Sequence, residues 1–355
     1  MMKFRNILVT GGAGFVGSSI AIRLKESFQD IRVTSVDNLK RRGSELTLPR
    51  LRDKGVAFRH GDIRCPEDLD LLPDYDLVID CSAEPSVTGG PHSTPRYIIN
   101  TNLTGTMNCL ELARRCGAAF VFLSSSRVYS IASLNGIPFT EQETRFSWCG
   151  NGTGVSEHGV SEQFPVDGVR SMYGACKLAS ELLVQEYGAA SDLPVLINRC
   201  GILAGPWQMG RVDQGVMALW CARHIFRGSL TYNGFGGTGK QVRDFLHIDD
   251  FIDLLMCQLT RSDLWKGSPY NVGGGVKNSV SLQELTQICR RISGSNVELT
   301  GQRESNPLDL RIFITDSRRA CSEFAWAPAR SVDRIAEDTI TWINSHADSL
   351  KSILE

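Results

Sequence analysis

Tyr173 and Lys177 are the two residues whose types and spacing most directly indicate chemistry. They stand four residues apart in a stretch with helical periodicity, so the phenol and the ammonium share one helical face. A neighbouring cation stabilises a phenolate and lowers the tyrosine pKa from about 10 toward neutral pH. The pair therefore predicts a tyrosine that acts as a general base.

Three consecutive serines, Ser124, Ser125 and Ser126, stand at the end of the apolar segment 120–124. Side chains at the carboxyl ends of parallel strands face the crevice in which such sheets bind their ligands. A hydroxyl there can share the proton that Tyr173 moves. The residues alone leave open which of the three serines does so.

A glycine-rich turn precedes this pair in the chain. Gly11, Gly14 and Gly17 lie between the apolar segment 4–9 and the helical stretch 18–26. Such a turn lets the backbone approach a pyrophosphate, which lies on the positive end of the following helix. The spacing differs by one residue from the dehydrogenase fingerprint, and it predicts a dinucleotide site.

Asp37 stands twenty residues beyond Gly17, at the end of the second predicted strand. A carboxylate at that place accepts hydrogen bonds from the ribose hydroxyls of a dinucleotide. Its charge repels a 2'-phosphate, which favours NAD over NADP although the basic residues 40–42 follow. Asp62 and Ile63 are placed to meet the adenine, although Asp62 could equally cap a helix.

The elements that must position these residues alternate between short β-branched runs and helical patterns, which is typical of βαβ units. Later elements are less regular, and residues 131–170 predict a functional loop. The chain thus predicts an α/β, doubly wound parallel sheet (a Rossmann fold) over residues 1–200. Residues 201–355 predict a smaller, interleaved substrate lobe, with residues of about 240–275 returning to the first domain. The predicted strands are 4–9, 32–37, 56–60, 77–81, 120–124, 195–199 and 242–247, and the main predicted helices are 97–116, 171–187, 215–227, 249–260, 282–293 and one near 332–343.

Composition limits the partners and the compartment. The chain has 355 residues, 42% of them hydrophobic, and a formal net charge of -1, which gives no electrostatic reason to expect nucleic acid or a membrane surface. Eleven cysteines without a CxxC pair indicate no disulfide scaffold or zinc site. With no apolar run of about 18 residues and no signal peptide, we expect a cytoplasmic protein. His247 is interpreted as a strand-end histidine before a helix capped by an aspartate, and we predict no metal site.

Taken together, these residues resemble the extended short-chain dehydrogenase/reductase family over nearly the whole chain. The resemblance implies that Ser125, Tyr173 and Lys177 are catalytic and that Lys177 also holds the nicotinamide ribose. It implies NAD contacts from Gly11, Gly14, Phe15, Val16, Gly17, Asp37, Asn38, Asp62, Ile63, Ala83, Asn102, Ser124, Tyr173, Lys177, Arg199 and Cys200. It implies contacts to a nucleotide-diphosphate sugar from Ser126, Gln208, Gln241, Arg243, Arg303 and Asp309.

Within the family, several segments look most like the subgroup that epimerises CDP-paratose at carbon 2. These segments are residues 36–43, 60–64, 143–145, 213–215 and 239–244. By resemblance to other members, the helices at 97–116 and 171–187 would form the interface of a homodimer.

Ser126 and Arg127 limit which of the family's reactions fits this chain. Dehydratases and decarboxylases of this family carry carboxylates near these positions. Their absence favours oxidation, rotation of a keto intermediate and return of the hydride to its other face. We rank 2-epimerisation of a CDP-dideoxyhexose first and 4-epimerisation of a UDP- or dTDP-sugar second. A non-catalytic NAD-binding regulator is the alternative from another class, although it would not need Ser125, Tyr173 and Lys177.

Overall fold

The computed structural model describes residues 2–85, 94–210 and 214–354. Its centre is a seven-stranded sheet in the order β14-β10-β5-β4-β1-β2-β3, and all neighbouring strands pair in parallel. The chain reverses its direction across the sheet between β1 and β4, which leaves a crevice at the carboxyl ends of the strands. The predicted doubly wound fold is confirmed. The strands are β1 (Asn6–Thr10), β2 (Arg32–Asp37), β3 (Ala57–His60), β4 (Leu77–Asp80), β5 (Ala119–Ser125), β10 (Val195–Cys200) and β14 (Tyr270–Val272).

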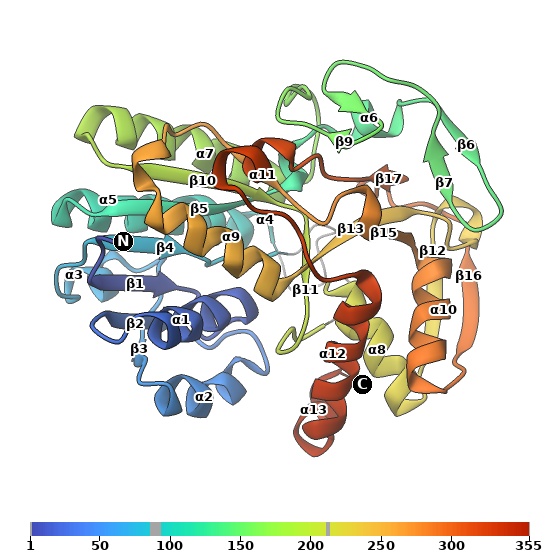
Figure 1. The fold of residues 1–355 in the computed structure, drawn as a ribbon, viewed down its shortest axis with the longest axis horizontal. Helices are drawn as coiled ribbons and strands as arrows, with labels where there is room; N and C mark the ends of the chain where they lie inside the picture. Colours follow the sequence, from blue (N-terminus) through green and yellow to red (C-terminus); the bar gives the residue numbers. More distant parts are fainter. Residues whose placement is uncertain (1, 86–93, 211–213, 355) are drawn as a thin grey trace.

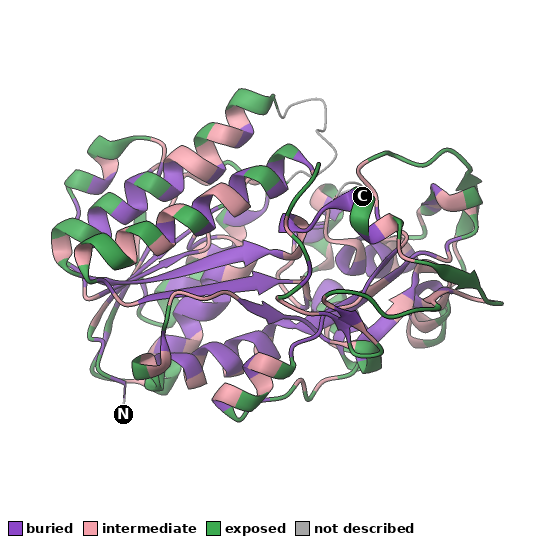
Figure 2. Ribbon diagram, turned by 90° about the horizontal axis from the view of Figure 1, so that it is seen from above, coloured by how far each residue is buried: buried purple, intermediate pink, exposed green. Residues whose placement is uncertain are grey.

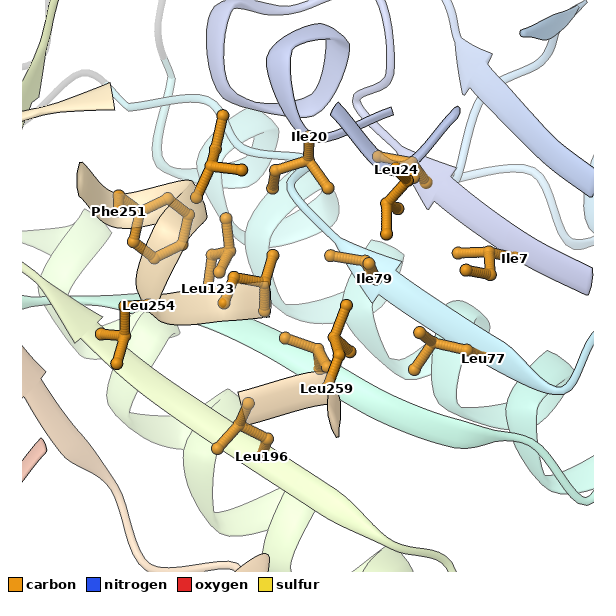
Figure 3. Close-up of a cluster of buried hydrophobic side chains, with 14 of the residues drawn as sticks. Ile7, Ile20, Leu24, Leu77, Ile79, Leu123, Leu196, Phe251, Leu254 and Leu259 are labelled. Atoms are coloured by element: carbon orange, nitrogen blue, oxygen red, sulfur yellow. The ribbon is translucent and has the colours of Figure 1, made fainter. Parts of the chain in front are cut away.

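Helices cover both faces of this sheet (Figure 1). Helices α1 and α9 pack on one face, and α5 and α7 pack on the other. Figure 3 shows how Ile20 of α1 and Phe251 of α9 reach the same apolar layer as Ile7 and Ile79 of the sheet. The central strands β1, β4, β5 and β10 are buried along almost their whole length (Figure 2), whereas the edge strand β3 is mostly exposed. These helices are α1 (Phe15–Ser27), α5 (Gly105–Cys116), α7 (Met172–Ser191) and α9 (Ile248–Thr260), with the shorter α2 (Leu48–Asp53), α3 (Pro66–Asp70) and α11 (Arg318–Phe324).

A second lobe lies beyond the carboxyl ends of the sheet, toward the right of Figure 1. In its small sheet β13 pairs with β11, β15 and β17, and the helices of the lobe bury a separate apolar cluster. Strands β12 and β16 form a further parallel pair. The elements are β11 (Ile202–Ala204), α8 (Val216–Phe226), β12 (Ser229–Asn233), β13 (Val242–His247), β15 (Ser279–Ser281), α10 (Leu282–Ser293), β16 (Glu298–Gln302), β17 (Ile312–Phe313), α12 (Val332–Ser345) and α13 (Ala347–Leu354).

The chain passes between the two lobes more than once. After β13, α9 packs on the first sheet and β14 becomes its edge strand, whereas β13 itself stays in the second sheet. Residues 248–272 therefore belong with the first lobe. The boundary near residue 200 stays a prediction.

The helix predicted over residues 97–116 is wrong as one regular element. It consists of α4 (Pro95–Ile99), a π-helical turn (Asn100–Thr104) and α5. The wide turn lies over Ile63, and a Cβ added to Gly105 would come within 2.5 Å of the Ile63 side chain. The helical spacing of the apolar residues did not reveal this turn, because a π-turn adds only one residue to a helical turn and shifts the apolar face by that one residue.

Residues 131–170, predicted to be an irregular loop, contain short regular elements. They are α6 (Ile131–Asn135), the hairpin of β6 (Phe139–Glu141) and β7 (Phe146–Trp148), and the hairpin of β8 (Val155–Ser156) and β9 (Gly159–Val160). The amide of Val160 donates to the carbonyl of Ile314 at 2.8 Å, so this segment is tied to the second lobe.

Within the ranges that the structure describes, no helix is both long and apolar enough to span a bilayer, and no cluster of side chains is arranged to hold a metal ion. His247 lies at the end of β13, as expected, but the predicted aspartate cap of the next helix is wrong. His247 itself is the N-cap of α9, and its Nδ1 accepts a hydrogen bond from the amide of Asp249 at 2.9 Å.

Candidate active site

A cleft of about 1640 Å³ runs between the carboxyl ends of the sheet and the second lobe. Among the residues that line it are almost all of those predicted to bind a cofactor or substrate. They are Gly11, Gly14, Phe15, Val16, Gly17, Asp37, Asn38, Asp62, Ile63, Ala83, Ser124, Ser125, Ser126, Tyr173, Lys177, Cys200, Gln208, Gln241, Arg243 and Asp309. The fold thus brings residues from six strand ends and a distant lobe to one continuous space.

The glycine turn has no room for side chains. A Cβ added to Gly17 would lie 2.3 Å from the carbonyl oxygen of Gly11, and Gly11 itself has a φ of +61°. A Cβ on Gly14 would meet only the Gly11 oxygen, at 3.0 Å, because this glycine faces the cleft at the N-cap of α1. The turn therefore brings backbone and a helix N-terminus directly to the cleft, as an anion site requires.

Asp37 stands at the end of β2 beside this turn. Its Oδ2 accepts from the amide of Ala13 at 3.1 Å, and its Oδ1 accepts from the amide of Leu39 at 2.8 Å. Burial raises the pKa of this carboxyl group, and the backbone hydrogen bonds oppose that shift. Asp37 is thus both a support for the turn and a carboxylate at the edge of the cleft.

Asp62 lies at the same end of the cleft. It does not cap a helix, since the N-cap of α3 is Cys65. Its carboxylate accepts from the guanidinium of Arg64 and, at 3.0 Å, from the amide of Asn38, and the Arg64 hydrogen bond holds the pKa of Asp62 well below its usual range. Asp62 therefore keeps a negative charge and a fixed orientation in this part of the cleft.

Ser125, at the end of β5, meets Tyr173 because the start of α7 packs closely against the segment that follows the strand. Ser125 accepts from the amide of Arg127 at 3.2 Å and so shapes the turn after the strand. A Cβ on Gly174 would come within 2.1 Å of the Arg127 carbonyl oxygen, so the first turn of α7 lies against this segment. Tyr173 and Ser125 are both less than 10% exposed, and their hydroxyl groups are hydrogen-bonded.

The acidity of Tyr173 differs from the expectation. Burial raises its pKa to about 12, and the Ser125 hydrogen bond and the positive charge of Arg127 act in the opposite direction. The ammonium of Lys177 donates to the carbonyl of Leu123 at 2.8 Å instead of to the phenol. The cation that lowers the tyrosine pKa in this structure is thus Arg127, which the spacing of Tyr173 and Lys177 did not indicate.

The far end of the cleft is built from long polar side chains. Arg243 binds Asp309 at 2.8 Å and the carbonyl of Leu310 at 2.6 Å. The side-chain amide nitrogen of Gln241 donates to the backbone carbonyl of Asn233 at 2.9 Å. The side-chain oxygen of Gln241 therefore points away from Asn233. Gln208 is held in the same way by the carbonyl of Leu203. This end offers guanidinium donors and amide acceptors to a ligand.

Three predicted residues do not line the cleft. The side chain of Asn102 is buried and bonds the backbone of Glu84, because the π-turn directs it there. Arg199 forms a buried ion pair with Glu181, since strand alternation points it toward α7. Arg303 directly follows β16 and is exposed, and it is not among the residues that line the cleft. Asp213, part of a segment that carried the resemblance, lies outside the described residues.

Four charged residues that line the cleft were missed as contributors to its charge: Arg127, Arg223, Glu84 and Glu304. Burial and the neighbouring charge of Arg243 lower the pKa of Arg127 to about 10. The position of Arg127, two residues after Ser125, was the available signal. Arg223 lies on a regular helix and carries no such signal.

Comparison with known proteins agrees with this arrangement. Residues 7–273 match the model of the NAD dependent epimerase/dehydratase family. The chain belongs to this family. It is 30% identical over 352 residues to a CDP-paratose 2-epimerase of Salmonella typhi, which covers 96% of this chain and 99% of that protein.

Further members of the epimerase/dehydratase family show the same extent of similarity. A UDP-glucose 4-epimerase of Erwinia amylovora is 26% identical, over 95% of this chain and 97% of that protein. A structure of UDP-glucuronic acid 4-epimerase from Bacillus cereus, in complex with UDP-glucuronic acid and NAD, superposes with a TM-score of 0.79 at 24% identity, over 96% and 99% of the two chains. At that identity the structural match supports the fold.

The enzyme uses NAD, and the residues at the first end of the cleft fit this cofactor. A Cβ on Gly17 would fill the space that the turn leaves for backbone, so only glycine keeps the amide groups at the cleft. The Asp37 carboxylate lies beside them. When bound, NAD supplies a hydride acceptor and donor.

Proposed function

We propose that this enzyme epimerises a nucleotide-diphosphate sugar by transient oxidation and reduction of one ring carbon. The observation that carries the proposal is the hydrogen-bonded pair of Ser125 and Tyr173 in the cleft, followed by Ser126 and Arg127 where an elimination would need a carboxylate. A serine hydroxyl and an arginine guanidinium are both protonated at neutral pH, so neither supplies the base that an elimination needs.

The residues of the chain act on protons and charge. Tyr173, as phenolate, takes the proton from a sugar hydroxyl, while Ser125 holds the same proton by a hydrogen bond. The positive charge of Arg127 and the Ser125 hydrogen bond oppose the burial that raises the pKa of Tyr173, and they favour its phenolate form during proton transfer. After the sugar has turned, Tyr173 returns the proton to the oxygen. NAD, held by the glycine turn and by Asp37, would supply the hydride acceptor and donor that this oxidation and reduction need.

The first candidate substrate is a CDP-linked dideoxyhexose that is epimerised at carbon 2. The whole-length similarity to the Salmonella typhi CDP-paratose 2-epimerase supports this choice. The guanidinium of Arg243, held by Asp309, supplies the forked donor that suits diphosphate oxygens. Gln208 and Gln241 would accept hydrogen bonds from hydroxyl or amino groups of the substrate.

A second candidate is 4-epimerisation of a UDP- or dTDP-sugar. It is supported by the similarity to the Erwinia amylovora UDP-glucose 4-epimerase over nearly the full length of both chains. Both candidates share the proton transfer at Tyr173, so the substrate distinguishes them.

We also propose that the enzyme is a homodimer through α5 and α7. Met107 of α5 and Met172 and Leu182 of α7 are exposed on neighbouring helices. Their apolar side chains would be covered by a second copy. Light scattering should give twice the mass of the 39.1 kDa chain, and Leu182→Glu should shift it to the monomer.

The proposed reaction is tested with CDP-, UDP-, dTDP- and GDP-sugars in deuterated water, read by mass spectrometry and NMR. We expect one of them to give its epimer without solvent deuterium on carbon, because the proposed oxidation and reduction would return the same hydrogen to the ring carbon. Incorporation of deuterium on carbon would indicate enolisation or elimination. Failure to convert any of the sugars would contradict the proposal.

A further inference from the structure

Glu181 continues the row that Tyr173 and Lys177 begin. The three residues are four positions apart on α7, so they share one face of the helix. That face lies toward the carboxyl end of the sheet, and Glu181 is only 3% exposed. A carboxylate this deeply buried needs specific partners.

Arg199 is the main partner of Glu181. Its Nε donates to Oε1 at 2.9 Å and its terminal nitrogen donates to Oε2 at 2.7 Å, so both oxygens of the carboxylate are engaged. The hydroxyl of Ser124 donates to the same Oε1. Glu181 thus joins α7 to two strands, β5 and β10, directly below the cleft.

The network extends across three strands in register. Ser124 lies opposite Arg199, and Arg199 lies opposite Asn271 of β14. The remaining guanidinium nitrogen of Arg199 donates to the hydroxyl of Tyr129 at 3.1 Å, which donates to Asn271 at 2.8 Å. Both ends of the segment between Ser124 and Tyr129, which contains Ser125, are therefore held by this network.

We propose that Glu181 is a positioning residue that fixes Tyr173 and Lys177 on α7 relative to Ser125 at the end of β5. The ion pair of Glu181 and Arg199 beneath the site keeps the distance between the hydroxyl groups of Tyr173 and Ser125 within the narrow range that proton transfer needs. The inference rests on the proposed function, because it assigns Glu181 a part in the same proton transfer.

Glu181 also acts on the charge of Lys177. Burial lowers the pKa of Lys177, and the negative charges of Asp80 and Glu181 oppose that shift. Loss of the Glu181 charge should therefore let Lys177 lose its proton at a lower pH. The titratable groups that interact with Lys177 are Asp80 and Cys81 at the end of β4, Cys109 of α5, Cys176 and Glu181 of α7, and Cys200 of β10.

Three variants test the two parts of this role. Ser124→Ala removes the strand end of the network and leaves the Glu181 charge in place, and Glu181→Gln removes the charge and one acceptor. Both should lower kcat at least about tenfold, with KM for the sugar nucleotide within about threefold, because binding contacts are kept while alignment is lost. Glu181→Gln should also move the alkaline limb of the pH profile to lower pH. Glu181→Asp keeps the negative charge on a shorter side chain. It should therefore restore the alkaline limb of the pH profile to its wild-type position but leave kcat low.

Gln258→Met is the matched control. Gln258 and Asn198 form a buried reciprocal amide pair at 2.9 Å on the opposite face of the same strand β10. This variant should lower Tm and leave kcat and the pH profile unchanged. Glu181→Gln could fail to fold because Arg199 is left as an unpaired buried charge. In that case the double variant Glu181→Gln/Arg199→Met, which removes both charges, is measured in place of the single variant.

A kcat within threefold of the wild type in both Ser124→Ala and the Glu181 variant would overturn the inference. So would equal losses in Gln258→Met. A measurement without substrate separates this result from failure of the proposed function. NMR titration of isotope-labelled lysine, assigned with Lys177→Arg, should show a lower pKa for Lys177 in Glu181→Gln. An unshifted titration overturns the inference, whereas a wild type that converts no sugar nucleotide overturns the proposed function alone.

Discussion

The two ends of the cleft are built by different means. The dinucleotide end is made mainly of backbone, and its closest contacts join Gly17 to Gly11, only six residues away. The substrate end is made of side chains from distant segments, such as Arg243 and Asp309, which are 66 residues apart. The first end depends on local sequence, and the second depends on the packing of a whole lobe. Substitutions at the two ends should therefore fail in different ways.

Tyr173→Phe tests the region where the two ends meet, and we expect it to have the largest effect. Loss of the phenol removes the proton acceptor, so kcat should fall by about a hundredfold or more. Binding of NAD and of the sugar nucleotide should change little, because neither end of the cleft is altered. The measurements are steady-state kinetics and calorimetric titration of both ligands.

Tyr75→Phe is the matched control for this variant, since Tyr75 is also buried but does not line the cleft. It should keep the activity of the wild type. A Tyr173→Phe variant with full epimerase activity would show that another group moves the proton.

Gly17→Ala tests the dinucleotide end. The new methyl group would lie 2.3 Å from a backbone oxygen that cannot move without opening the turn. We expect NAD affinity to fall by about a hundredfold, which corresponds to roughly 2.7 kcal/mol. Affinity for the nucleoside diphosphate should stay within about threefold if the two ends are independent, as expected for sites without shared partners.

Gly150→Ala is the control for this substitution, because a Cβ there meets nothing within 4 Å. Calorimetry with NAD and with CDP or UDP gives both affinities. A parallel loss of both ligands would mean that the two ends of the cleft share one scaffold.

Arg243→Met tests the substrate end. It removes a guanidinium that faces the cleft and is held by Asp309. We expect KM for the sugar nucleotide to rise about tenfold to a hundredfold, the usual range for a lost charge-assisted hydrogen bond. NAD affinity should not change.

Arg303→Met sharpens this result, because the family resemblance placed Arg303 at the substrate whereas the structure exposes it outside the cleft. It should change KM by less than about threefold, as surface substitutions usually do. An increase in KM as large as that of Arg243→Met would show that Arg303 contacts the bound sugar nucleotide.

The same contrast explains what could be predicted from the sequence. The glycine turn, the pair of Tyr173 and Lys177 and a serine at the end of the fifth strand follow from short spacings and strand ends, whereas the choice of Ser125 came from the family resemblance. The structure brings these residues together at the cleft. Arg199 could not be placed, because a residue at a strand end can point either into the crevice or toward a covering helix. The acceptor of the Lys177 ammonium, the carbonyl of Leu123, also depends on tertiary contacts. The spacing of residues in the sequence predicts which face of a helix they share, but it does not predict which groups of other elements lie opposite that face.

The pH dependence of stability should show the smallest effect, and it concerns the second lobe. Burial lowers the pKa of His247, which caps α9, and that of His224 on α8. Folded protein therefore keeps both imidazoles neutral, whereas the unfolded chain takes up protons as the pH falls through about 6.5. The free energy of unfolding should be highest above that pH and should fall below it, by at most about 1.4 kcal/mol per pH unit for each histidine.

His247→Asn isolates one of these two protons, because asparagine also caps a helix but does not titrate. Denaturant titrations at pH 7.5, 6.5 and 5.5 should give a shallower loss of stability for this variant than for the wild type. His158→Asn, at an exposed position, should leave the slope unchanged. Equal slopes for His247→Asn and the wild type would mean that the pKa of His247 is the same in the folded and the unfolded chain, so that this imidazole does not contribute to the loss of stability in acid.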